Sequence, residues 1–166
     1  MHCQLRQKYK TSDRFGNLME LYEKNYMQLR LLIPELKRIP QMPVVSHVSG
    51  CLPVYFKLLE QTPYTSRLHL TYRFGDARDA RAMVAPDFEI RVYHDARTAE
   101  VVSGLLHGQQ HVERKTRNLD DSWRLNRYLY KWLAYLLRRG HRLQWEESAN
   151  PVAEPAGGMS ELKVSQ

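Results

Sequence analysis

The chain has 166 residues and a formal net charge of +7, with 43% hydrophobic residues and 2 cysteines. This length supports one hydrophobic core and argues against two full domains. Cys3 and Cys51 are too few for a disulfide framework or a thiolate zinc site, and no apolar run approaches the roughly 20 residues of a membrane span. We therefore expect a single cytoplasmic domain with no membrane partner. Its basic surface favours an anionic partner.

The first predicted element is an amphipathic helix near the N-terminus. Residues 1–12 are polar and are expected to form a flexible N-terminus, and Ser12 or Asp13 can cap a helix that runs to Ile33, just before a proline. Asn25 lies at the edge of its apolar stripe and needs a hydrogen bond if it is buried. The stripe consists of Phe15, Leu18, Met19, Tyr22, Tyr26, Leu29 and Ile33.

The middle of the chain alternates between apolar and polar residues, which predicts four or five strands. A hairpin is expected around Gly50, and Pro53 should lie at a strand start or edge. Short turns between the strands favour an antiparallel meander, because parallel pairs need long crossovers. The predicted strands are 44–49, 52–60, 64–74, 87–94 and 98–106.

Alternation also predicts which side chains face the core. The inward residues are Leu68, Leu70, Tyr72, Phe74, Phe88, Ile90 and Val92. The outward face is predicted to be solvated and of mixed charge, with some aromatic residues. Its members are Tyr55, Lys57, Arg67, His69, Thr71, Arg73, Glu89, Arg91 and Tyr93.

A second amphipathic helix is predicted over residues 121–140, after a polar and basic link. Asp120 or Asp121 can cap it, and Gly140 can end it in the left-handed conformation. Its apolar stripe is Leu125, Leu129, Trp132, Leu133 and Leu136. Four cations lie on the opposite side, with Tyr128 and Tyr135 along the border. We call these four residues the cationic face: Arg124, Arg127, Lys131 and Arg138.

These patterns predict one α+β domain over residues 13–147. An antiparallel meander of four to five strands should pack one face against the N-terminal and C-terminal helices. Leu143 and Trp145 could dock the end of the domain, as an edge strand. Residues 148–166 are rich in Pro, Ala, Gly, Ser and Glu and are expected to be a disordered tail.

Residues that could carry chemistry are few. His94-Asp95 could ligate a metal in a phosphate-ester hydrolase, but His94 has inward parity and Asp suits the turn that follows, which favours a structural role. His107 and His111 have the spacing of a helical metal site, yet Gly108 and the polar surroundings favour a loop. The sequence has no nucleophile elbow, dinucleotide fingerprint or P-loop, and it gives no reason to expect a cofactor.

Three segments resemble the YqiB-like family of bacterial proteins, a domain of unknown function. They read NYMQLRLLIP at 25–34, IRVYHDARTAEV at 90–101 and LNRYLYKWLAYLLRRG at 125–140. The resemblance spans roughly residues 14–145 and implies a single cytoplasmic domain. It implies no activity, cofactor or catalytic residue.

Three functions follow as hypotheses, and the sequence does not decide whether the protein is an enzyme. The first is a non-enzymatic binding or adaptor protein that uses the cationic face for an acidic protein or a nucleic acid. The second is a metal-assisted hydrolase of a phosphorylated small molecule at His94 and Asp95. The third is a carrier of a small apolar ligand between sheet and helices. The sequence sets neither the partner nor the oligomeric state.

Overall fold

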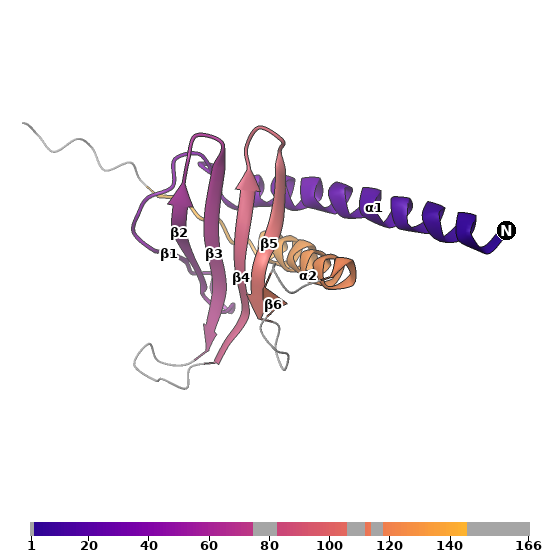
Figure 1. Cartoon of the computed structure of the whole chain (residues 1–166). Coiled ribbons are helices and arrows are strands. Elements are labelled where there is room, and N and C mark those ends of the chain that lie inside the picture. The colour runs from indigo at the N-terminus through magenta and orange to yellow at the C-terminus, as the bar shows by residue number, and fades with distance from the viewer. Residues whose placement is uncertain (1, 75–82, 106–111, 114–117, 146–166) are drawn as a thin grey trace, which may run out of the picture.

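A computed structural model describes the backbone of residues 2–74, 83–105, 112–113 and 118–145. Within these ranges, helix α1 spans His2–Leu32 and helix α2 spans Leu119–Arg138, with the strands between them in sequence (Figure 1). The strands are β1 Val44–Ser46, β2 Val54–Gln61, β3 Thr65–Phe74, β4 Met83–Tyr93, β5 Thr98–Leu105 and β6 Val112–Glu113.

Each strand pairs antiparallel with the next one along the chain, giving a 6-stranded sheet in the order β1-β2-β3-β4-β5-β6. The predicted α+β class and antiparallel meander are confirmed. The added strand, β6, pairs through two residues with Ser103 and Gly104. It lies in the segment that was predicted to be a polar link. A strand of two residues is too short to show the alternation of apolar and polar residues that identifies a strand in the sequence.

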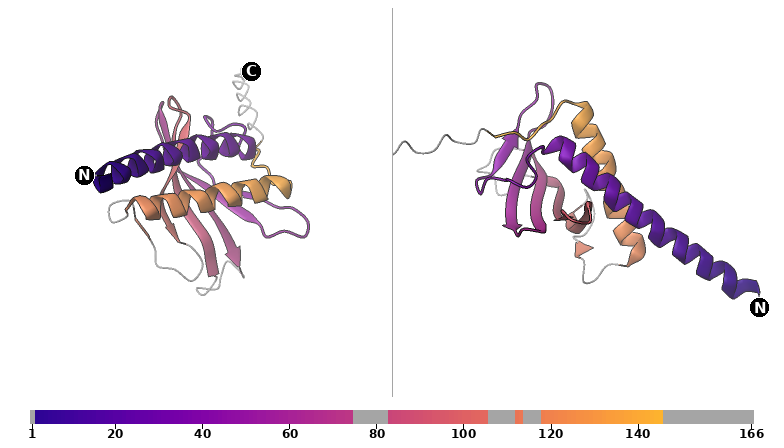
Figure 2. Two further views of the ribbon diagram at one scale, coloured as in Figure 1. Left: turned by 90° about the vertical axis from the view of Figure 1, so that its right-hand side faces the viewer. Right: turned by 90° about the horizontal axis from the view of Figure 1, so that it is seen from above.

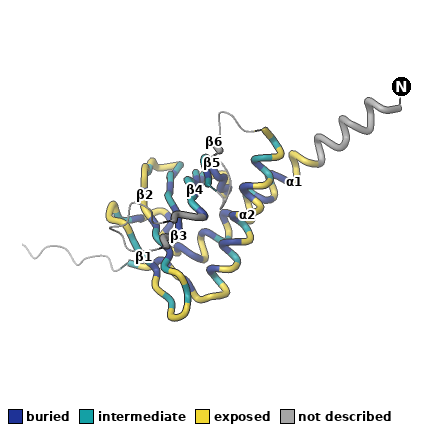
Figure 3. Tube along the Cα trace, turned by 90° about the horizontal axis from the view of Figure 1, so that it is seen from below, coloured by how far each residue is buried: buried dark blue, intermediate teal, exposed yellow. Residues whose placement is uncertain are grey.

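Both helices lie on the same face of the sheet and run side by side across it (Figure 2). The buried residues lie between these two layers, whereas the chain is exposed along the outer sides of the helices and at the turns (Figure 3). The predicted inward residues of β3 and β4 are confirmed wherever their side chains are described, since all of them are at most 8% exposed. They are Leu68, Leu70, Tyr72, Phe88, Ile90 and Val92.

Helix α1 begins at His2, earlier than the predicted start at Ser12 or Asp13. No Gly or Pro interrupts the segment before Gly16, so nothing in the backbone requires a later start. Phe15 was predicted to face the core and is 58% exposed. The N-terminal half of α1 runs past the sheet (Figure 1), so the apolar stripe has nothing to pack on there. Further along, Leu29 and Ile33 are fully buried, as predicted.

The sheet departs from simple alternation at its bulges. Thr71 was predicted to point outward but is 3% exposed, next to a register shift between β3 and β4. Its hydroxyl donates to the carbonyls of Tyr72 and Pro86 at 3.0 and 3.1 Å, which satisfies the buried oxygen. A second shift separates the pairs Glu89↔Ser103 and Ile90↔Val101.

The ends of the predicted elements are largely as expected. Gly50 has a φ of 73° in the connection between β1 and β2, and Pro53 directly precedes β2. Gly140, with a φ of 88°, follows α2. Leu143 is buried, and its amide donates to the carbonyl of Leu32 at 2.8 Å, so this segment caps the end of α1. Residues 141–145 form no strand, so the edge-strand prediction was wrong.

Candidate anion-binding surface on helix α2

The first turn of α2 is capped by a residue that the sequence pattern did not single out. The side chain of Asn118 accepts from the amide of Asp121 at 2.9 Å, which makes Asn118 the N-cap in place of Asp120 or Asp121. The two aspartates lie inside the first turn, where their charges favour the positive end of the helix dipole. Asn and Asp are equally good caps, so composition could not separate the three candidates.

The apolar side of α2 faces the core as predicted. All five residues of the predicted stripe are buried, and Trp132 is the most exposed of them at 6%. Trp132 packs edge-on against Tyr72 and Phe88, with ring centroids 5.0 and 5.8 Å apart. This packing fixes the rotation of the helix about its own axis and therefore decides which residues face solvent.

All four residues of the cationic face are exposed. Arg124 forms an ion pair with Asp121 at 3.0 Å. Arg127, Lys131 and Arg138 form no ion pair with any residue in the described ranges, so their charges are not neutralised there. Arg114, Lys115 and Arg117, which could extend this face, lie outside the described residues.

Two tyrosines border this surface. Tyr128 and Tyr135 are 40% and 38% exposed. Arg139 lies over the Tyr135 ring, 5.4 Å from its centroid, and its Nε donates to the phenol oxygen at 3.3 Å. Burial raises the pKa of the Tyr128 hydroxyl above its usual value of 10.0, so the hydroxyl stays protonated at neutral pH. The surface therefore offers cations beside aromatic rings.

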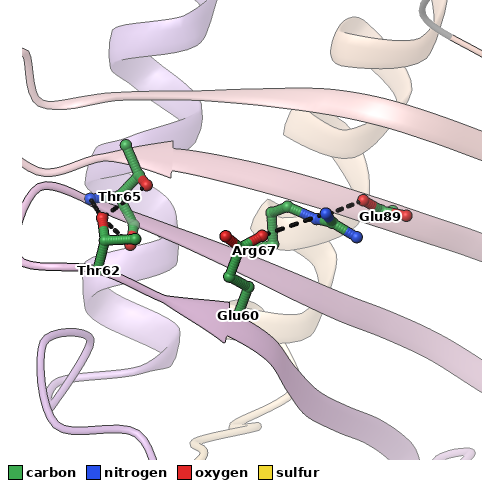
Figure 4. A network of polar contacts seen from close by, with 5 residues as sticks. All are labelled: Glu60, Thr62, Thr65, Arg67 and Glu89. Atoms are coloured by element: carbon green, nitrogen blue, oxygen red, sulfur yellow. Dashed lines mark hydrogen bonds and ion pairs between the residues drawn. The ribbon is translucent and has the colours of Figure 1, made fainter.

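Several charged residues on the open face of the sheet pair with one another. Arg67 pairs with Glu60 at 3.2 Å and with Glu89 at 2.8 Å, joining three neighbouring strands (Figure 4). His69 contacts Asp87 one strand away. Figure 4 also shows the turn between β2 and β3, where the hydroxyls of Thr62 and Thr65 lie 2.9 Å apart. Arg67 and His69 on this face thus have acidic partners, whereas Arg127 and Lys131 in the middle of α2 have none within the described ranges.

His94 and Asp95 are not directed toward a common ligand position. His94 is 7% exposed, as its inward parity predicts, and its Nε2 lies 2.8 Å from the hydroxyl of Ser66. Asp95 is exposed and accepts from the amide of Ala96 at 2.8 Å, which is a turn interaction. Across the described ranges, no three His, Cys, Asp or Glu side chains come close enough to hold a metal ion. His107 and His111 lie outside those ranges.

A buried polar contact between the two helices was only half visible in the sequence. Asn25 is fully buried, and its Nδ2 lies 3.3 Å from both the carbonyl and the side-chain oxygen of Asn126. Asn126, also fully buried, accepts from the amide of Val101 at 3.0 Å. The predicted need for a hydrogen bond at Asn25 is confirmed. Asn126 was missed, although it lies one residue from Leu125 on the apolar side of α2.

Neither described helix contains an apolar stretch that could cross a membrane.

Comparison with known proteins gives a family. The family described as "Protein of unknown function (DUF1249)" matches residues 28–142. The chain is 28% identical to the Escherichia coli K12 protein named "Uncharacterized protein YqiB" over 131 residues, which cover 76% of this chain and 90% of that protein. The proteins of the same name from E. coli O6:H1 and O157:H7 give the same values. No solved structure matches. The chain belongs to the DUF1249 family, and the predicted YqiB-like resemblance is confirmed.

Proposed function

We propose that the protein is a non-enzymatic binding or adaptor protein that holds an anionic partner on the cationic face of α2. The observation that carries the proposal is the row of exposed cations, of which Arg127, Lys131 and Arg138 form no ion pair within the described ranges. Exposed charges of this kind contribute little to folding, so stability alone gives no reason to place them in register. Their exposed positions leave them available to an anion.

The bordering tyrosines favour a single-stranded nucleic acid as the first probe. Bases stack on exposed aromatic rings, and cations in a row follow the phosphates. Tyr128 and Tyr135 lie seven positions apart, about 10.5 Å along the helix axis, so each ring has cations within one turn. An acidic protein is the second probe, because it needs the cations and does not need the rings.

The other two hypotheses gain no comparable support. The imidazole of His94 is directed to Ser66, and Asp95 stabilises a turn. The space between sheet and helices holds tightly packed side chains that include Phe56, Phe88 and Leu129. We therefore rank the hydrolase and the carrier below the binding protein.

The test is a binding titration with single-stranded RNA and DNA oligonucleotides, followed by a pull-down with acidic proteins. Replacing Arg127, Lys131 and Arg138 together with Gln should weaken binding at least about tenfold, or about 1.4 kcal/mol. The free energy of unfolding should change by less than about 0.5 kcal/mol. With a nucleic acid, the slope of log affinity against log salt should fall by about one unit for each phosphate that the variant no longer neutralises.

The matched control removes the same charge elsewhere. Lys37, Arg38 and Lys57 are exposed and lie off α2, and their joint replacement with Gln should retain most of the binding. The proposal fails if the wild type binds no RNA, DNA or acidic protein at moderate salt. It also fails if the α2 variant keeps every partner, or if the control variant binds as weakly as the α2 variant.

A further inference from the structure

The solvent-facing side of α1 carries two large apolar residues among its charged ones. Met27 and Leu31, four positions apart on one side of the helix, are 66% and 58% exposed. The opposite side of these helical turns packs in the core, where Leu29 and Leu32 are fully buried. An amphipathic surface helix normally has one apolar side. No described part of the chain covers the exposed surfaces of Met27 and Leu31.

A groove lies along this side of α1. Its volume is about 640 Å³, and it lies between α1 and the turn that joins β4 to β5. We call its lining the α1 outer face: Glu23, Tyr26, Met27, Arg30, Leu31, Ala96 and Arg97. The left view of Figure 2 shows the β4–β5 turn rising beside α1, on the side away from α2. The groove is thus separate from the cationic face.

The wall of the groove has an uncommon backbone conformation. Arg97 has a φ of 53°, which places a residue other than glycine in the left-handed region. This conformation is unfavourable for a residue that carries a Cβ atom. A glycine would avoid the cost but would leave the groove without the aliphatic stem and the guanidinium. The Arg97 side chain lines the groove.

On the α1 outer face, an acidic residue precedes Met27 and a basic residue follows it. Glu23 lies four positions before it and Arg30 three positions after it, and neither forms an ion pair within the described ranges. A two-fold axis through Met27 would reverse the helix. Glu23 would then lie within one residue, about 1.5 Å along the axis, of Arg30 of the partner subunit. Because a two-fold axis repeats every contact, the dimer would contain this ion pair twice.

We propose that the α1 outer face is the contact of a symmetric dimer in which α1 packs antiparallel against α1 of a second copy. A purely acidic partner would meet Glu23, and a purely basic one would meet Arg30 and Arg97. An inverted copy of the same helix satisfies both signs and covers Met27 and Leu31. Arg30 and Arg97 both line the groove into which the partner's Glu23 enters. This inference is independent of the proposed function on α2.

The contact consists of one helix side and one turn, so the dimer is expected to be weak. Stable interfaces bury about 800 Å² per partner. We expect a dissociation constant in the micromolar range, with each of the two ion pairs setting register more than affinity.

The experiment measures the mass of the full chain by sedimentation equilibrium up to about 100 µM, where a micromolar dimer is populated. The wild type should approach twice the 19.6 kDa chain mass. Met27→Glu places a charge at the centre of the contact and should give a monomer. Glu23→Arg and Arg30→Glu each create two like-charge contacts and should raise the dissociation constant at least about tenfold.

Two combinations test the antiparallel arrangement. A mixture of the Glu23→Arg and Arg30→Glu chains should form a heterodimer, because each cation then faces a carboxylate. The double variant Glu23→Arg/Arg30→Glu should dimerise like the wild type. The matched control is Lys57→Glu, which reverses an exposed charge on β2, off α1, and should leave the dimer intact. Circular dichroism checks that every variant is folded.

The proposal is overturned if the wild type stays monomeric at about 100 µM, a concentration that populates a micromolar dimer. It is also overturned if Met27→Glu leaves the dimer unchanged, or if the mixed single variants do not associate.

Discussion

At the scale of single residues, Asn126 connects three parts of the fold. It accepts from Val101 of β5, contacts Asn25 of α1, and donates through Nδ2 to the carbonyl of Ser122 at 2.8 Å in its own helix. The register shift between β4 and β5 lies beside Val101. At this irregular point of the sheet, the amide of Val101 donates to a side chain of α2. The three segments that resemble the YqiB-like family meet at this contact.

Replacing Asn126 with Ala should lower the free energy of unfolding by about 1 to 3 kcal/mol, because it removes a buried acceptor from Val101 and from Asn25. Urea denaturation measures the change. Asn17 is exposed on α1, and Asn17→Ala should stay within about 0.5 kcal/mol of the wild type. A loss of stability at Asn126 no larger than that at Asn17 would show that the contact does not support the fold.

At the scale of elements, β5 must pass close to an aromatic ring of β4. A Cβ atom added at Gly104 would lie 2.5 Å from Cδ1 of Phe88. Phe88 cannot move aside easily, because it is fully buried and packs edge-on against Trp132 and Tyr128. Glycine is therefore required here by space and not by backbone conformation.

Gly104→Ala should cost about 1 to 3 kcal/mol through displacement of this ring. Thermal unfolding gives the cost, and near-ultraviolet circular dichroism should change because Trp132 shifts with Phe88. Gly16 provides the matched control, since nothing lies within 4 Å of its added Cβ. Gly16→Ala in α1 should be neutral or stabilising by up to about 1 kcal/mol. Equal stability of the two variants would contradict the steric argument.

Elements with a long periodic pattern were predictable from sequence, and those whose identity depends on neighbours were not. The five buried leucine and tryptophan positions of α2 repeat often enough to define its inner side, and that same geometry identified the exposed cations. The two-residue strand β6 carries no period, and the start of α1 carries no breaker. Met27 and Leu31 lie outside the apolar stripe that the sequence predicts for α1, and they are exposed.

At the scale of the whole molecule, two buried histidines join parts of the chain that are distant in sequence. His94 follows β4 and contacts Ser66 of β3, whereas His141 follows α2 and its Nδ1 lies 2.9 Å from the hydroxyl of Ser46 in β1. Burial lowers the pKa of His141 below its ordinary 6.5. Burial also lowers the pKa of His94, with a further lowering from Lys37 that Asp95 partly offsets.

These directions set the sign of a pH dependence. Because the pKa of each imidazole is lower in the folded chain than in the unfolded chain, the unfolded state binds more protons below about pH 6.5. The free energy of unfolding should therefore fall as the pH drops below that value. Each histidine contributes up to about 1.4 kcal/mol per pH unit until its folded-state pKa is reached.

The measurement is urea denaturation at pH 7.5 and pH 5.5. The wild type should be less stable at pH 5.5 than at pH 7.5, by at most about 3 kcal/mol, which is the limit for two histidines titrating over one unit. His94→Gln/His141→Gln should be less stable at pH 7.5 but should lose much less on acidification. His47 is exposed, and His47→Gln should keep the wild-type difference. If the double variant lost as much stability on acidification as the wild type, carboxyl groups and not these two imidazoles would account for the pH dependence.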